Sequence, residues 1–200
     1  MSNNKIGNSI KSRKNPNDKI FTPKPLAVDM IRMCEIKAGE RVLDPSKGEG
    51  VFYDNLPTEC KADWCEIDEG KDFFSYDKEV DVIVGNPPYS LWNKWLEKTL
   101  ELKPQRFCYI FGAMNLTPKR LQIIRDAGYS ISKIQFTRVV WWFSYSIIVL
   151  FEKGIVGLIK EPLPIRYNCD ICNIGEAAEC GRGKARKGIK RGMNECGKKD

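Results

Sequence analysis

The chain has 200 residues, a formal net charge of +7 and no histidine. This length fits one domain with an appendage, and the missing histidine excludes Ser-His and Cys-His nucleophilic sites and histidine-ligated metals. The sequence shows no signal peptide and no apolar run close to the ~18 residues that a membrane span needs. We therefore expect a cytoplasmic protein, in a bacterium or a phage-infected host, that binds no membrane and keeps its cysteines mostly reduced.

The positive charge lies at the two ends of the chain. Residues 1–20 hold five Lys and Arg against one acid, residues 160–200 hold ten against six, and the middle holds eighteen against nineteen. Residues 1–19 are polar without periodicity, which predicts a disordered basic arm. Basic ends on a near-neutral body favour a polyanionic partner, although solubilising termini would have the same composition.

Residues 20–160 alternate between helical and strand patterns. After Phe21-Thr22-Pro23, helical spacing predicts a helix with Thr22 as its cap and Pro23 in its first turn. The elements that follow are strand 41–44, helix 51–56, strand 62–67, strand 80–84, helix 91–102, strand 106–111, helix 118–127, and strands 129–140 and 146–152. This alternation predicts an α/β fold with a mostly parallel sheet, closed by an antiparallel hairpin.

Asn86-Pro87-Pro88-Tyr89 follows the β-branched run from Val80 to Val84. The run predicts a buried strand, which ends where the prolines cannot donate ladder hydrogen bonds. Open α/β sheets bind ligands beyond the carboxyl ends of their strands. The tetrad offers a side-chain amide oxygen, a backbone carbonyl and an aromatic ring, which suit a planar molecule with an NH2 group. By itself, the tetrad fits a Pro-rich turn equally well.

Gly48 and Gly50 follow the first strand in a loop whose backbone can approach a ligand closely. Glu66, at the end of the next strand, can accept both hydroxyls of a ribose. No Lys-Ser/Thr pair follows the glycines as in a P-loop. The pattern therefore favours an adenosine ligand without a phosphate.

Asp72 is placed to accept a hydrogen bond from the exocyclic amine of such a ligand. Ile67 and Phe73 can hold a purine ring between them.

Five motifs occur in a fixed order: Phe21-Thr22-Pro23, Asp44-Pro45-Ser46-Lys47-Gly48-Glu49-Gly50, Glu66, Asp72-Phe73 and Asn86-Pro87-Pro88-Tyr89. In this order they resemble the class I S-adenosylmethionine-dependent methyltransferases that act on adenine N6 in DNA, in the gamma arrangement. The resemblance covers about residues 20–152. It implies a Rossmann-like fold whose sheet is of the seven-stranded type, with helices on both faces.

The resemblance also implies roles for single residues. S-adenosylmethionine would bind at Phe21, Thr22, Pro23, Asp44, Pro45, Ser46, Gly48, Gly50, Glu66, Ile67, Asp72, Phe73 and Asn86. The catalytic tetrad would be Asn86, Pro87, Pro88 and Tyr89, whose Asn86 side-chain oxygen and Pro87 carbonyl accept the hydrogens of the adenine amine. Tyr89 would stack on a flipped base, with one of residues 141–143, Phe143 or Trp142, on its other face.

The sequence departs from the family in two ways. Only five residues separate Glu66 from Asp72, so the helix usual there is missing or reduced to a turn, and Asp68 or Glu69 could replace Asp72. No stretch is long enough for a separate target-recognition domain. This is typical of a compact, phage-like enzyme, of the kind found in restriction-modification, with a short or relaxed recognition site.

Other functions share parts of this pattern. The tetrad also serves RNA adenine or guanine methyltransferases and protein glutamine methyltransferases, and cytosine N4 is a further target that usually goes with Ser in place of Asn86. The basic ends favour nucleic acid over protein, whereas RNA uses the same charge and stacking as DNA. A non-catalytic nucleic-acid-binding protein would not need the intact tetrad and glycine loop. The pattern leaves the oligomeric state open.

Residues 161–200 form a basic, cysteine-containing segment. Cys169 and Cys172 have the spacing of a zinc knuckle, and with Cys180 and Cys196 they could complete a structural Zn2+ site. Alternatively, the segment is a disordered tail with incidental cysteines. Six cations are predicted phosphate contacts in either case: Arg182, Lys184, Arg186, Lys187, Lys190 and Arg191. The remaining cysteines, Cys34, Cys60, Cys65 and Cys108, are predicted to lie in or near the core.

Overall fold

The computed structural model describes residues 20–138 and 145–155. Its helices are α2 (Lys24–Met33), α3 (Trp92–Leu102) and α4 (Pro118–Asp126). Its strands are β1 (Arg41–Asp44), β2 (Lys61–Trp64), β3 (Val82–Gly85), β4 (Arg106–Gly112), β5 (Tyr129–Thr137) and β6 (Ser146–Lys153). Short 3-10 turns lie at η1 (Tyr53–Asn55), η2 (Ile67–Glu69), η3 (Phe73–Ser75), η4 (Tyr89–Leu91) and η5 (Ala113–Asn115).

The described strands form one sheet in the order β2-β1-β3-β4-β6-β5. Neighbours from β2 through β4 pair in parallel, and β6 runs antiparallel to both β4 and β5. This confirms the predicted Rossmann-like α/β fold with a mostly parallel sheet and a final antiparallel hairpin. Because β1, β2 and β3 run parallel, their carboxyl ends lie together at one end of the sheet, where ligands of open α/β sheets bind.

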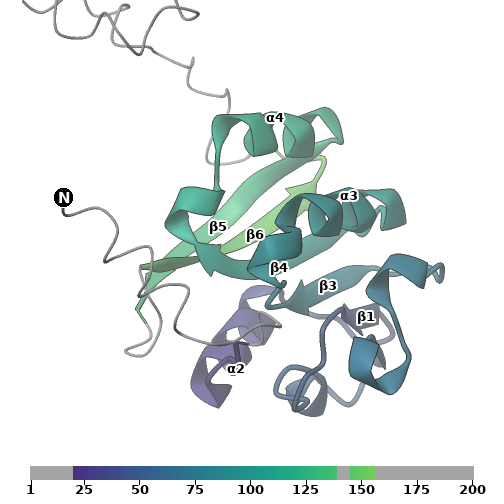
Figure 1. Ribbon diagram of the computed structural model, residues 1–200. Helices are drawn as coiled ribbons and strands as arrows, with labels where there is room; N and C mark the ends of the chain where they lie inside the picture. Colours follow the sequence, from purple (N-terminus) through teal and green to yellow (C-terminus); the bar gives the residue numbers. More distant parts are fainter. Residues whose placement is uncertain (1–19, 139–144, 156–200) are drawn as a thin grey trace, which may run out of the picture. The chain divides into compact units, whose positions relative to one another are not determined.

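Two apolar layers cover the sheet, one on each face (Figure 1). On one face, Trp92, Trp95 and Leu96 of α3 pack with Ile124 of α4. On the other face, the buried side of α2 packs against the β-branched residues of β3 and against β4. The central strands are apolar throughout because both of their faces are covered. The expected placement of helices on both faces is thus confirmed.

Some element boundaries differ from the predicted ones. Pro23, not Thr22, is the N-cap of α2, and no side chain caps this helix. The helix predicted over 51–56 is only the 3-10 turn η1, because Pro57 leaves no room for a further turn. The second strand ends at Trp64, so Glu66 lies just beyond it as the N-cap of η2. The strand predicted over 129–140 is described up to Thr137.

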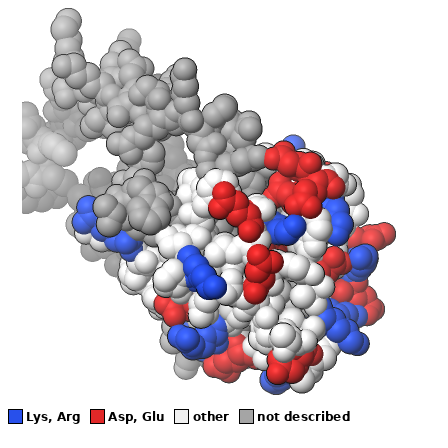
Figure 2. Space-filling view, turned by 90° about the horizontal axis from the view of Figure 1, so that it is seen from below, with Lys and Arg blue, Asp and Glu red and all other residues white. Residues whose placement is uncertain are grey.

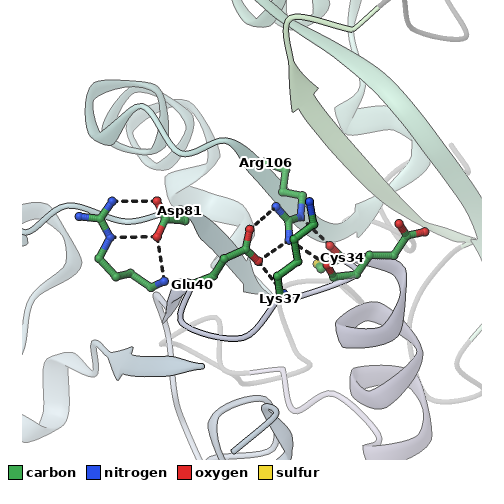
Figure 3. Close-up of polar contacts among 7 residues, drawn as sticks. Cys34, Lys37, Glu40, Asp81 and Arg106 are labelled. Atoms are coloured by element: carbon green, nitrogen blue, oxygen red, sulfur yellow. Dashed lines mark hydrogen bonds and ion pairs between the residues drawn. The ribbon is translucent and has the colours of Figure 1, made fainter. Parts of the chain in front are cut away.

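A largely buried ion pair joins elements at the amino ends of the strands (Figure 3). The Arg106 guanidinium donates to the Glu40 carboxylate at 2.6 and 2.9 Å and to the carbonyls of Cys34 and Glu35. Arg106 begins β4, and Glu40 precedes β1. Nearby, hydrogen bonds from Arg41 lower the pKa of Asp81 to about 2. These contacts fix the amino ends of the strands, away from their carboxyl ends.

The four cysteines of the described part are reduced and lie where they were predicted. Cys34, Cys65 and Cys108 are buried and Cys60 is half-buried. Burial raises the pKa of the Cys65 thiol to about 12. Within residues 20–138 and 145–155, none of the helices has the length and apolar character needed to cross a membrane.

Candidate active site

A pocket of about 980 Å³ lies beyond the carboxyl ends of β1, β2 and β3. Segments around residues 20–24, 45–55, 66–74 and 86–95 line it, so all five sequence motifs meet there. The predicted site residues on its wall are Phe21, Thr22, Pro45, Ser46, Gly48, Glu66, Ile67, Asp72, Phe73, Asn86, Pro87, Pro88 and Tyr89. Pro23, Asp44 and Gly50 do not line the pocket, and Trp142, Phe143 and the predicted residues of 161–200 fall outside the described residues.

Asp44 organises the glycine loop from behind. Its carboxylate accepts hydrogen bonds from the backbone N–H groups of Ser46 at 3.1 Å and Tyr53 at 3.3 Å. The side chain is fully buried, and this burial raises its pKa to about 7. The carboxylate is hydrogen-bonded to the loop backbone, and Asp44 does not line the pocket. That Asp44 contributes to S-adenosylmethionine binding stays a prediction.

The loop needs glycine at two positions. Gly50 has φ +87°, and a Cβ there would lie 2.8 Å from a carboxylate oxygen of Asp54. Gly48 has φ +53°, with the Phe21 ring 3.6 Å from the place a Cβ would occupy. The loop backbone thus lies directly against the segment that precedes α2.

Glu66, which follows β2, is hydrogen-bonded to the backbone of the glycine loop. Its carboxylate accepts from the N–H of Gly48 at 2.7 Å and from the N–H of Asp68 at 3.3 Å. A carboxylate offers about four lone-pair positions. Two backbone donors therefore leave it capacity to accept the hydroxyls of a ribose.

The predicted purine sandwich is only half formed. Ile67 is 65% exposed, but Phe73 is 2% exposed and its ring centroid lies 4.5 Å from that of Trp95. Phe73 is part of the core, so of these two side chains only Ile67 presents an exposed apolar surface. Asp72 caps η3 by accepting from the N–H of Phe74 at 3.0 Å.

Sequence reasoning missed a cation cluster on Trp64. The ammonium groups of Lys47 and Lys71 lie 4.0 and 3.5 Å from the Trp64 ring centroid, and Lys47 also pairs with Glu69 at 3.0 Å. Trp64 and Lys71 belong to no motif, and the chain returns toward Trp64 through the isolated antiparallel bridge between Glu66 and Lys71. The cluster ties the glycine loop to the turns that follow β2.

Contacts from two other segments hold Asn86. Its amide nitrogen donates to the Ile20 carbonyl at 2.8 Å, and its backbone carbonyl accepts from the Ser46 hydroxyl at 3.1 Å. Its side-chain oxygen Oδ1 is buried and has no hydrogen-bond partner among the described residues. Gly85 permits this arrangement, because a Cβ there would lie 2.9 Å from the Pro45 ring. No motif pointed to the role of Ile20.

Carboxylates outnumber cations on the pocket wall. The cations are Lys24, Lys47 and Lys71; the acids are Glu49, Asp54, Glu66, Asp68, Glu69 and Asp72. This balance disfavours a phosphate-bearing ligand, as the absence of a P-loop pattern predicts. Elsewhere, acids and bases are interspersed on the face seen in Figure 2, in line with the near-neutral charge of the body.

Metal ligands do not cluster in the described part of the chain, since no group of three Cys, Asp or Glu side chains there could hold a metal ion. The four cysteines proposed to bind zinc lie outside these residues, so that prediction stands as it was made.

No protein-family model and no curated protein matches the sequence. Solved structures match the fold. A candidate RNA methyltransferase of Pyrococcus horikoshii is 17% identical, with 78% of this chain and 100% of that chain covered and a TM-score of 0.54. The methyltransferase subunit of a type I restriction-modification system from Streptococcus thermophilus is 15% identical, with 68% and 45% covered and a TM-score of 0.54.

A magnesium protoporphyrin IX methyltransferase from Synechocystis, solved with bound S-adenosylmethionine, is 14% identical, with 65% and 77% covered and a TM-score of 0.51. The three are described as different kinds of methyltransferase, and what they share with this chain is the overall fold. The chain therefore has the Rossmann-like fold of the class I methyltransferases.

Proposed function

We propose that the protein transfers a methyl group from S-adenosylmethionine to the N6 amine of adenine in DNA. One observation carries the proposal: a single pocket joins a glycine loop, an acid suited to ribose and the Asn-Pro-Pro-Tyr tetrad. The likeness in fold to DNA and RNA methyltransferases supports methyl transfer to a nucleic acid. The basic ends of the chain support a polyanionic substrate.

The residues present fit S-adenosylmethionine. Glu66 retains acceptor capacity for the ribose hydroxyls, and exposed Ile67 offers a surface for the adenine ring. Gly48 and Phe21 both line the pocket, and the methionine part would lie beside them. When bound, the cofactor supplies an electrophilic methyl group on a sulfonium sulfur.

The tetrad would act on the substrate amine. The lone pair of adenine N6 is delocalised into the ring, so the amine is a weak nucleophile. Hydrogen bonds from its N–H groups to Asn86 Oδ1 and the Pro87 carbonyl favour a pyramidal nitrogen, whose lone pair can attack the methyl carbon. The new N–C bond forms as the C–S bond breaks, the electron pair stays on sulfur, and one N6 proton passes to water.

Substrate entry requires a movement at the tetrad. Asn86 Oδ1 is shielded from solvent in this structure, so an amine reaches it only after the covering groups shift. Tyr89, half-buried at the start of η4 on the pocket wall, would stack on the incoming base. An unpaired buried acceptor costs about 1–3 kcal/mol, and a bound amine would satisfy it.

A methyl-transfer assay tests the proposal. The protein is incubated with tritiated S-adenosylmethionine and duplex DNA, single-stranded DNA, tRNA, rRNA or protein extract, and the modified nucleoside is identified. We expect N6-methyladenine in DNA. Label in RNA alone would establish the RNA alternative, and label in protein the glutamine alternative. Cofactor binding without any label would establish a non-catalytic nucleic-acid-binding protein.

Asn86→Ala tests the role of the tetrad. Loss of a preorganised acceptor lowers kcat by about 100-fold or more, while S-adenosylmethionine affinity, measured by calorimetry, should change less than about threefold because Glu66 and the glycine loop are intact. Asn93→Ala, on the exposed face of α3, is the matched control and should keep full activity. An equal loss of cofactor affinity and activity in Asn86→Ala would assign Asn86 to cofactor binding instead.

A further inference from the structure

The Ile20 carbonyl fixes which way the Asn86 amide faces. The amide nitrogen lies 2.8 Å from this carbonyl oxygen. Turning the amide over would place Oδ1 there instead, and two acceptors would then face each other. The contact with Ile20 therefore sets Oδ1 as the acceptor on the other side.

The backbone of Asn86 is fixed as well. Its carbonyl accepts from the Ser46 hydroxyl at 3.1 Å, and Gly85 before it packs against the Pro45 ring. The side chain cannot move away from Ile20 by a small shift of the main chain. A different side chain at position 86 must meet the Ile20 carbonyl in the place where the amide nitrogen now lies.

We propose that the Ile20 carbonyl is a positioning group that restricts residue 86 to a side chain with a hydrogen-bond donor facing Ile20 and an acceptor opposite. An amide or a protonated carboxylic acid meets this requirement, and an ionised carboxylate does not. The link to activity rests on the function proposed above; the geometric requirement does not.

An ionised carboxylate at position 86 would find no hydrogen-bond donor for either of its oxygens in the described part of the chain. One oxygen would face the Ile20 carbonyl, and the other would take the buried position of Oδ1, which has no donor among the described residues. The titratable side chains on the wall of the pocket that Asn86 also lines are Lys24 of α2, Lys47, Glu49 and Asp54 after β1, Glu66, Asp68, Glu69, Lys71 and Asp72 after β2, and Tyr89 of η4; Asp44 of β1 lies behind the glycine loop. The Asn86 amide nitrogen itself donates to the Ile20 carbonyl.

Asn86→Asp tests the requirement through its pH profile. When protonated, the introduced carboxylic acid can donate to Ile20 and keep an acceptor opposite, so acid should restore function. We expect the kcat of the variant, divided by that of the wild type at the same pH, to rise at least about tenfold from about pH 8 to about pH 5.5, because a raised carboxyl pKa lies in that range. A ratio that is constant with pH, or full activity at the higher pH, would overturn the proposal.

Thermal unfolding gives a second readout that needs no activity. Because the folded state should raise the pKa of the introduced carboxyl group above its unfolded value, the Asn86→Asp variant loses stability as the pH rises. Its Tm deficit against the wild type should therefore be larger at the higher pH than at the lower one. Both proteins contain Asp44, so its own titration cancels in the difference. Asn93→Asp, on the surface, should show no such pH-dependent deficit.

The two readouts separate this inference from the proposed function. A wild type without methyl transfer would refute the function, while the Tm comparison would still test the contact with Ile20. A Tm deficit equal at both pH values, or a variant unfolded at both, would overturn the contact even if the wild type methylates DNA.

Discussion

At the residue scale, Asp44 shows how a buried charge shapes the site. Its carboxylate holds the Ser46 and Tyr53 N–H groups and so bends the loop that carries Gly48 and Gly50. Burial opposes its ionisation and raises its pKa to about 7. The folded protein therefore binds a proton at Asp44 in a pH range where the unfolded chain does not.

This difference predicts the pH dependence of stability. Between about pH 4 and pH 7 the folded state holds the Asp44 proton and the unfolded state has lost it, so stability falls as the pH rises, by up to about 4 kcal/mol. Acids with a lowered pKa, such as Asp81, change the stability only below about pH 4, so they add no pH dependence between about pH 5 and pH 8. Urea unfolding of the wild type should thus give a higher free energy at about pH 5 than at about pH 8.

Asp44→Asn should remove most of that difference, because an amide does not titrate. Asp126→Asn, at the exposed end of α4, serves as the matched control and should keep the wild-type profile. A wild type that is equally stable at both pH values would show that Asp44 ionises without penalty.

The sequence predicted the ligand-facing residues better than the residues behind them. Gly48 and Glu66 were identified because a backbone approach and a ribose acceptor require those residue types. Phe73 lines the pocket but is also part of the core, which its residue type could not reveal, since an aromatic side chain fits a core as well as a ligand wall. Ile20 was missed because it acts through its backbone carbonyl, which every residue type has.

At the element scale, contacts at the amino ends of the strands, opposite the pocket, hold the sheet together. Arg106 at the start of β4 is 8% exposed and joins Glu40 to the end of α2. Removing one partner of a buried ion pair leaves an uncompensated charge. This joint should therefore matter for stability and not for ligand contacts.

Glu40→Ala should lower the free energy of unfolding by about 3 kcal/mol, because the Arg106 guanidinium then loses its carboxylate partner and keeps only the Cys34 and Glu35 carbonyls. Asp29→Ala removes an acid from an exposed pair with Arg32 and should change stability by less than about 1 kcal/mol. Urea titration measures both. Below the melting transition, S-adenosylmethionine affinity should be unchanged in both variants; a loss in Glu40→Ala would mean that the two ends of the sheet are coupled.

Element types were predictable, whereas several boundaries depended on tertiary contacts. β3 and β4 could be predicted because continuous apolar runs are typical of strands that are covered on both faces. The end of β2 was not clear, because Cys65 continues the apolar pattern and its N–H still donates to the Asp44 carbonyl of β1. The reduced connection between Glu66 and Asp72 was expected from its length and is present as the single turn η2.

At the scale of the whole molecule, charge is divided between a near-neutral body and basic ends. The face of the described part that is seen in Figure 2 mixes both signs. We expect the cations of residues 161–200 to contribute nucleic-acid affinity without sequence preference, through counterion release from the phosphates.

Replacing Lys184, Lys187 and Lys190 by Gln should weaken DNA binding and reduce the slope of log affinity against log salt by about 3. The matched control replaces Lys37, Lys61 and Lys103, which are exposed and do not line the pocket, and should keep the wild-type slope. Fluorescence anisotropy at several salt concentrations measures both. Equal slopes for the two triple variants would refute a phosphate-binding role for residues 161–200.

Two short turns connect β2 to β3, so no helix encloses the side of the pocket next to Ile67, which is 65% exposed. In the proposed binding mode, the adenine ring of the cofactor would face outward there. Synthetic cofactors with bulky groups on that ring would extend into solvent instead of meeting a wall. This geometry would make the chain a compact starting point for tagging nucleic acids with reporter-bearing cofactors, without first enlarging the pocket by mutation.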